Sequence, residues 1–236
     1  MLEGDWEFYW DTLIEPHNFP TTIKPQYIMF PKLWKDIENP EKNLSSYGCA
    51  TYHLKIKLPS TGNILALEIP DFYTSYILWL NGEIIAKNGE VGPDKSSSKP
   101  YWLPMTYTFK VDDKEMEMVL QIANYQHSKG GASKAIKLGL SEDLSIDREL
   151  SLGIDLLLTG ALTMGGLFFL GLYLFGRQDK AVFYFSAFCL TYSYRIIGTG
   201  QYYLHNILSN VNWQITTRLE YLSLFLSTLF FMLFLQ

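Results

Sequence analysis

A polar segment follows an apolar, alternating stretch at residues 124–131, which read NYQHSKGG. Asn124, His127 and Lys129 carry groups that can bond the hydroxyls or an acidic group of a small ligand. A polar loop with paired glycines, placed where a strand ends, is a common position for binding residues in β-proteins. The alternative is that Asn124 ties the loop to the main chain and that the glycines satisfy turn geometry.

Tryptophans supply a second kind of candidate chemistry, because the flat face of an indole packs well against the C–H surface of a sugar ring. Trp6 and Trp10 are four residues apart, so a strand places them on one face. Packing in the core or between strands is the competing interpretation for both. Trp79 lies within an apolar hairpin strand and is expected in the core.

Arg195 interrupts an apolar run that starts at residue 181. At ~1.5 Å per helical residue it lies roughly 22 Å along that run, where an ionisable group usually faces other helices and finds a partner. Glu220 and Asp155 are the available partners, and a contact between Arg195 and Glu220 is predicted to couple helix packing to the preceding domain. The alternative is an arginine that snorkels to the membrane interface.

Metal, cofactor and catalytic chemistry are not expected. The four histidines, at positions 17, 53, 127 and 205, show no paired ligand spacing. Phosphate-binding loops, nucleophile elbows and zinc-helix signatures are absent, and no spacing selects a pair of carboxylates as a hydrolase would need.

The composition divides the chain into two unlike parts. Overall it is 48% hydrophobic and 18% charged over 236 residues, between the values of soluble and multi-span proteins. Residues 1–150 hold 15 of the 19 Lys and Arg and 21 of the 24 Asp and Glu, a net charge of −6, against +1 for residues 151–236. An acidic first part argues against nucleic acid as a partner.

The first part alternates with period two. Residues 51–58, 64–69, 76–80, 83–86 and 115–123 predict strands, with Asn81-Gly82 as a type I′ hairpin turn between the third and fourth. Many short strands with Pro, Gly and Asn between them favour an all-β, jelly-roll-like sandwich over residues 1–147.

The second part, residues 148–236, predicts α-helical membrane spans at about 156–176, 181–203 and 219–236, so that the lipid bilayer is an expected partner. Arg177 and Lys180 lie between the first two spans. By the positive-inside rule this loop is cytoplasmic, and residues 1–150 are extracytoplasmic.

The start MLEGDWEFYW lacks the features of an export signal, and the third span stops at the last residue. We therefore expect a piece of a longer protein, with a genuine three-span product as the alternative.

Several motifs occur in an order that resembles a known family. They are GDWEFYW (4–10), IMFPKLW (28–34), YGCATYHLKIKLP (47–59), YILWLNGEIIAKNGEVG (76–92), QIANYQHSKGG (121–131) and RLEYLSLFL (218–226). Together they resemble the bacterial seven-transmembrane receptors with diverse intracellular signalling modules. The motifs of the first part are also similar to the sugar-binding accessory domain of some glycoside hydrolases. The later helices and the output module of such receptors are not in this sequence.

The resemblance implies the sensory and anchoring portion of a receptor in the bacterial cytoplasmic membrane. Its external sandwich would bind a small ligand, with a carbohydrate as the suggested class, and it would not be an enzyme. Two alternatives stay open: a membrane-tethered carbohydrate-binding or adhesion module, and the accessory part of an envelope glycan-processing enzyme. Whether the full-length receptor is a homodimer is also open.

Overall fold

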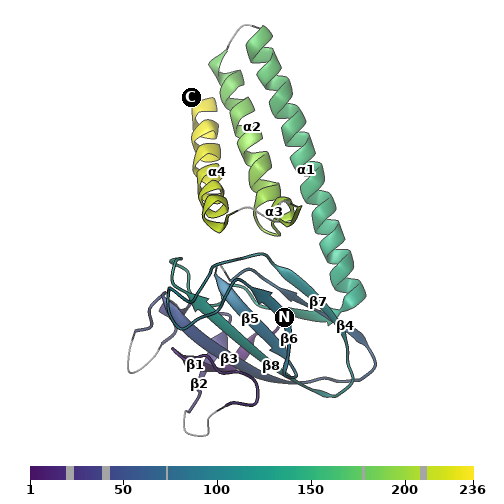
Figure 1. Ribbon diagram of the computed structural model, residues 1–236. Coiled ribbons are helices and arrows are strands. Elements are labelled where there is room, and N and C mark those ends of the chain that lie inside the picture. The colour runs from purple at the N-terminus through teal and green to yellow at the C-terminus, as the bar shows by residue number, and fades with distance from the viewer. Residues whose placement is uncertain (20–23, 39–42, 73, 177–178, 208–211) are drawn as a thin grey trace. The chain divides into compact units, whose positions relative to one another are not determined.

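The computed structural model describes residues 1–19, 24–38, 43–72, 74–176, 179–207 and 212–236 (Figure 1). The chain divides into two compact units, Met1–Leu144 and Ser145–Gln236. The first, called the β unit below, holds every described strand. The second, called the helical unit, consists of helices.

The β unit contains two antiparallel sheets in its described residues. The larger has six strands, in the order β2 (Gln26–Phe30), β1 (Gly4–Trp10), β3 (Gly48–Lys57), β8 (Glu115–Asn124), β5 (Ser75–Leu80) and β6 (Glu83–Asn88). The smaller has three, β7 (Met105–Lys110), β4 (Ile64–Ile69) and β9 (Lys137–Leu140). A short 3-10 helix, η1 (Trp34–Asp36), follows β2.

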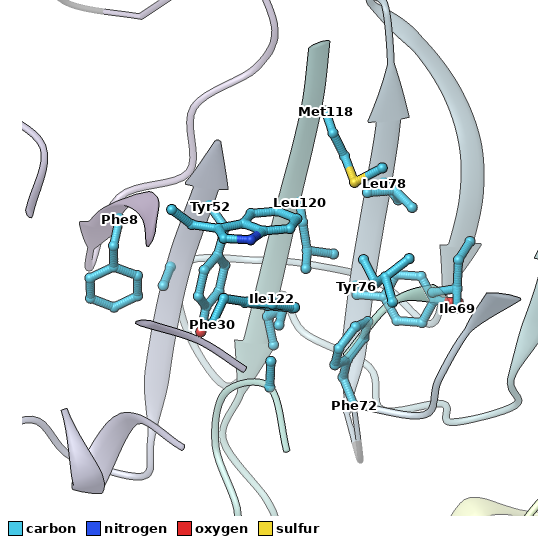
Figure 2. Packing of buried hydrophobic residues seen from close by; sticks show 14 of the residues in the cluster. Phe8, Phe30, Tyr52, Ile69, Phe72, Tyr76, Leu78, Met118, Leu120 and Ile122 are labelled. Carbon is cyan, nitrogen blue, oxygen red and sulfur yellow. The ribbon is translucent and has the colours of Figure 1, made fainter. Parts of the chain in front are cut away.

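Alternation along each strand creates the core (Figure 2). On β8 the apolar side chains at even positions, from Met116 to Ile122, all join one buried cluster. Leu67 and Ile69 of β4 belong to the same cluster, so both sheets contribute to a shared core. Each fully buried side chain of this size contributes roughly 1.5–3 kcal/mol.

The predicted strands are confirmed, with shifts of a few residues at their ends. Asn81 and Gly82 both have positive φ, 49° and 87°, as a type I′ turn requires. Antiparallel sheets followed by helices confirm the fold prediction in its coarser form. The two sheets are unequal, and β1, β2, β7 and β9 lie outside the predicted strand ranges, although MTYTFK of β7 does alternate between apolar and polar residues.

The helices are α1 (Ser141–Phe175), α2 (Lys180–Gly198), α3 (Tyr203–Ile207) and α4 (Trp213–Phe234). Within the described residues, α1 and α4 are long and apolar enough to cross a membrane. The predicted second span, 181–203, is not among them: α2 stops at Gly198 and carries a lysine, an arginine and several hydroxyl side chains. Arg177, used for the orientation, lies outside the described residues.

Small residues let α1 and α2 approach closely. A Cβ on Gly166 of α1 would lie 2.8 Å from Leu190 Cγ of α2, and the Ser186 hydroxyl donates to the Gly166 carbonyl at 2.8 Å. Neighbouring Gly165 has nothing within 4 Å of its Cβ position. One glycine of the pair therefore serves helix packing and the other does not.

Candidate functional site

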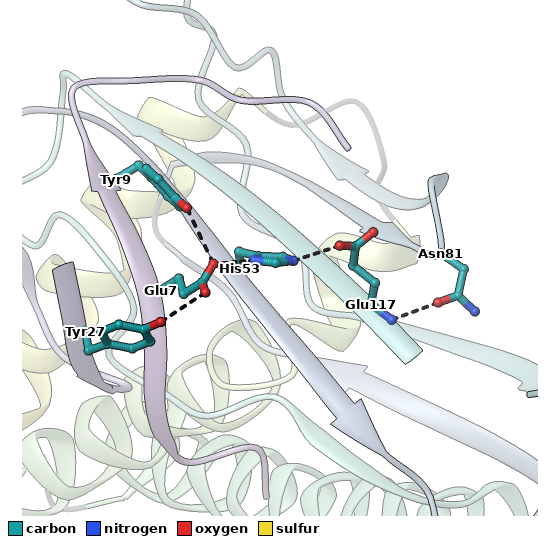
Figure 3. A network of polar contacts seen from close by, with 6 residues as sticks. All are labelled: Glu7, Tyr9, Tyr27, His53, Asn81 and Glu117. Carbon is teal, nitrogen blue, oxygen red and sulfur yellow. Dashed lines mark hydrogen bonds and ion pairs between the residues drawn. The ribbon is translucent and has the colours of Figure 1, made fainter. Parts of the chain in front are cut away.

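A histidine held between two carboxylates lies on the face of the six-stranded sheet that is turned away from the core, called the outer face below (Figure 3). His53 Nδ1 is 2.5 Å from Glu7 Oε2, and His53 Nε2 is 2.8 Å from Glu117 Oε1. His53 is only 7% exposed, whereas both glutamate side chains keep 29% exposure. Because an ionised carboxylate can only accept, each bond needs a proton between nitrogen and oxygen.

Three adjacent strands bring this network together. Glu7 of β1 stands directly opposite His53 of β3. Glu117 of β8 is paired with Lys55, and so it is the diagonal neighbour of His53. The hairpin turn fixes Glu117 further, because Asn81 Oδ1 accepts from the Glu117 main-chain N–H at 2.8 Å and the Asn81 N–H donates to the Glu117 carbonyl at 2.8 Å.

Two tyrosines complete the network at its β1–β2 end. Tyr27 donates to Glu7 Oε1 at 3.2 Å and Tyr9 to Glu7 Oε2 at 3.4 Å. The charge of Glu7 raises the pKa of the Tyr27 hydroxyl, while burial and then Glu7 raise the pKa of Tyr9. Tyr9 is buried, but Tyr27 is 64% exposed, so its ring is open to solvent beside a carboxylate.

A half-open hollow of about 320 Å³ adjoins the network at the ends of β3 and β8. Its lining is of mixed charge and consists of Lys55, Ile56, Lys57, Asn81, Glu115, Met116 and Glu117. Glu117 belongs to both the hollow and the network. Ammonium donors, carboxylate acceptors and an amide thus surround a space with a small apolar floor, which suits a polar, uncharged ligand with several hydroxyls.

The predicted aromatic ligand contacts, Trp6 and Trp10, pack within the β unit. Trp6 is 1% exposed and stacks on Phe30 with ring centroids 4.3 Å apart. Trp10 is half-buried against the edge of Trp34, at 5.0 Å. Trp6 therefore has no free indole face, because alternation on β1 turns it toward the core.

The predicted polar loop is tied up internally. Asn124 is fully buried, and its amide donates to the carbonyls of Ser46 and His127, both at 2.7 Å. His127 is 6% exposed and its Nδ1 accepts from the Lys129 N–H at 3.1 Å; burial, and then the charge of Lys129, lower its pKa. Lys129 itself is exposed.

The paired glycines of this loop serve close packing. A Cβ on Gly130 would lie 2.0 Å from the Ser46 carbonyl oxygen and 2.5 Å from the Trp34 ring. Only glycine fits there without a shift of main chain. Gly130 thus makes room for Trp34 and Ser46, a packing role that the sequence did not indicate, while Asn124 ties the loop to the main chain as in the alternative interpretation.

Arg195 and Glu220 do approach one another, but not as a simple ion pair. Arg195 Nη1 donates to the main-chain carbonyl of Glu220 at 3.3 Å. The Glu220 carboxylate accepts from the Tyr202 hydroxyl, also at 3.3 Å. Asp155 lies half-buried on α1, and in the described part of the chain no ion pair joins it to Arg195.

Sequence reasoning did not single out Glu7, Tyr27, His53, Asn81 or Glu117 as a group. Each lies on the polar side of its strand or in its turn, which alternation alone could have shown. Their convergence depends on the order β1-β3-β8, and nothing local in the sequence specifies that order. No cluster of three or more potential metal ligands occurs among the described residues.

No family model and no curated protein matches this chain. Among solved structures it is similar to a β-glucuronidase from an uncultured Clostridium species, with 15% identity, a TM-score of 0.45, and coverage of 58% of this chain and 28% of that one. It is also similar to a GH2 β-galacturonidase from Eisenbergiella tayi (15%, TM-score 0.38, 57% and 23%) and to a β-glucuronidase from Faecalibacterium prausnitzii (22%, TM-score 0.38, 50% and 20%). The chain spans about a quarter of the length of these structures.

Proposed function

We propose that this chain is a membrane-anchored binding module whose β unit binds a small polyhydroxylated ligand, a carbohydrate, on the outer face of its six-stranded sheet. The observation that carries the proposal is the pair of partly exposed carboxylates, Glu7 and Glu117, held in place by buried His53, together with the hollow that Glu117 also lines. Fixed acceptors and donors at spacings set by a sheet can bind ring hydroxyls without first becoming ordered.

The choice of a carbohydrate as the ligand class rests on the side chains around the site. Tyr27 offers an exposed ring that can pack on the C–H face of a sugar, and its hydroxyl is already held by Glu7. Lys55, Lys57, Glu115 and Glu117 balance in charge, so the hollow favours a neutral ligand over a strongly anionic or cationic one.

Membrane anchoring is supported by α1 and α4. The apolar run within α1, about 20 residues, corresponds to ~30 Å of helix, the thickness of a hydrocarbon core. We place the β unit on the extracytoplasmic side of a bacterial cytoplasmic membrane, in keeping with the resemblance to the receptor family and with Lys180 after the first apolar helix.

A role in signal reception is the finer part of the proposal. β9 ends at Leu140 and α1 begins at Ser141, so no linker separates the last strand of the β unit from the first apolar helix. A ligand with different affinities for two arrangements of β9 would bias α1 as well. The free energy available is limited to that difference in affinity.

The test is a titration of the full chain in lipid nanodiscs with oligosaccharides of glucose, galactose, mannose and N-acetylglucosamine. Binding is measured by calorimetry and by tryptophan fluorescence. We expect binding by at least one sugar, with a loss of tenfold or more in Tyr27→Ala and Glu117→Gln. Glu90→Gln is the matched control, because Glu90 is an exposed partner of Lys99 outside the network. Binding that survives both site variants would reject the outer face, and no response to any sugar would reject the ligand class.

A further inference from the structure

Residues 11–19, called the strap below, leave β1 and cross the outer face over the central strands. Asp11 begins this path, with its N–H donating to the Cys49 carbonyl of β3 at 2.8 Å. Asp11 and His17 have φ of 54° and 70°, a left-handed backbone that marks where the strap turns.

Two side chains of the sheet hold the main chain of the strap. The Thr51 hydroxyl donates to the Thr12 carbonyl at 2.7 Å and accepts from the Ile14 N–H at 2.9 Å. Gln121 Nε2 donates to the Ile14 carbonyl at 2.9 Å. Thr51 and Gln121 are directly paired on β3 and β8, and both are buried. Beyond Asp11, the bonds that hold the strap to the sheet thus come from side chains, whereas the strands beneath it are joined by ladders of main-chain bonds.

The far end of the strap rests on the network and on the hairpin turn. The Phe19 ring lies over the His53 imidazole, with centroids 4.5 Å apart, and 5.5 Å from the Tyr9 ring. His17 Nε2 is 2.9 Å from the Cβ position of Gly82 in the β5–β6 turn. The strap therefore contacts the sheet from β1 across to that turn.

The surface beneath the strap has the composition of a sugar site. Strand pairing places Thr51 beside Gln121 in one row, and His53, Val119 and Trp79 in the next. Trp79 and Val119 alternate with core residues and so lie on the outer face, yet they are only 7% and 1% exposed. An indole, an amide, a hydroxyl and an imidazole thus lie together on this face, and the strap bonds to or packs against three of them, at Thr51, Gln121 and His53.

We propose that these two rows of residues form a second, covered part of the ligand site and that the strap is its lid. The inference rests on the proposed function, because it extends the outer-face site from its open rim inward. The strap opens by exchanging the bonds of Thr51 and Gln121 with the Thr12 and Ile14 main chain for bonds to ligand hydroxyls. No covalent step and no cofactor is involved.

Local opening is tested without any ligand by hydrogen exchange of the full chain in nanodiscs. We expect peptides covering residues 12–18 to exchange at least a hundredfold faster than those of β3 and β8. In Thr51→Val, strap exchange should rise by about tenfold, since two bonds of ordinary strength are lost, with β8 unchanged. Thr108→Val, an exposed threonine on β7, is the control and should change nothing in the strap. If the amides of the strap exchanged only together with those of β8, the proposal that the strap is a lid would be rejected.

The effect of strap opening on sugar binding is tested at two strap residues that lie outside the two covered rows. Phe19→Ala and His17→Ala release the far end of the strap, so a lid predicts tighter sugar binding, by about threefold to tenfold, because a larger fraction is open. A strap that forms a fixed wall of the site predicts weaker binding, and this result would reject the proposal. Absence of sugar binding by the unaltered chain would instead reject the proposed function, whatever the exchange data show.

Discussion

His53→Leu removes the centre of the network and nearly preserves its volume. The histidine side chain is 8% exposed and makes two hydrogen bonds, of 2.5 and 2.8 Å, to groups that carry charge when ionised. Bonds of this kind contribute about 1.5–3 kcal/mol each. Leucine recovers part of this by packing beneath Phe19, and the two glutamates, at 29% exposure, can turn to water. We therefore expect a net loss of about 2–4 kcal/mol in the free energy of unfolding of the β unit.

Urea unfolding of the full chain in detergent micelles, followed by tryptophan fluorescence, measures this loss. Five of the six tryptophans lie in the β unit, so the signal reports mainly on its unfolding. Lys55→Ala is the control, because Lys55 lies two residues along the same face of β3 and is exposed. It should change stability by less than about 0.5 kcal/mol.

A double-mutant cycle separates the two bonds. Glu7→Gln and Glu117→Gln should each couple to His53→Leu by about 1 kcal/mol or more, because each replaces one of the two carboxylates that bond the same imidazole with a neutral amide. A loss below about 1 kcal/mol in His53→Leu, together with no coupling to either glutamate, would show that the network is an ordinary solvated surface. It would also remove the preorganised site on which the proposed function depends.

Three further perturbations test the packing and the turns. Gly130→Ala places a Cβ 2.0 Å from the Ser46 carbonyl oxygen and should cost at least about 2 kcal/mol in the urea assay, well above Gly139→Ala, whose Cβ position meets Leu144 Cγ at 3.4 Å, an ordinary contact. Gly166→Val should lower the thermal midpoint of the helical unit, read by circular dichroism at 222 nm, whereas Gly165→Val should leave it nearly unchanged; equal effects would contradict the α1–α2 contact. The Asp94 pKa is lowered to about 2 by bonds from Ser96 and Ser97, so the turn at residues 94–97 should keep its bonds above pH 4 and lose them as the pH falls through 2, seen in the amide resonances of Ser96 and Ser97. Amide resonances that do not move over that range would contradict this.

Local patterns determined much of the β unit. Alternation over residues 51–58 and 115–123 shows which side chains of β3 and β8 face inward, because a strand has a period of two whatever its neighbours are. Asn81-Gly82 specified a hairpin turn through the positive φ that these residues tolerate. The length and apolarity of the runs within α1 and α4 likewise depend only on composition.

The positions for which the sequence left two interpretations open share one physical cause. Whether Asn124 binds a ligand or closes a loop depends on where the carbonyls of Ser46 and His127 lie, and Ser46 is 78 residues away. Trp6 could face outward or inward until the pairing of β1 with β2 and β3 was known. In both cases the answer depends on distances between segments that are far apart in the chain. The type of a single residue does not specify such a distance.

The sequence by itself determined most of β3, β4, β5, β6 and β8, the turn at Asn81-Gly82 and the apolar runs within α1 and α4, and that charge is concentrated in the first 150 positions. Only the tertiary structure decided that Glu7 and Glu117, 110 positions apart, both lie within hydrogen-bonding distance of His53, and that Phe19 covers the His53 ring. The reason is that periodicity fixes which face a side chain occupies, whereas strand order and register, set by the packing of the whole core, fix which side chains meet on that face.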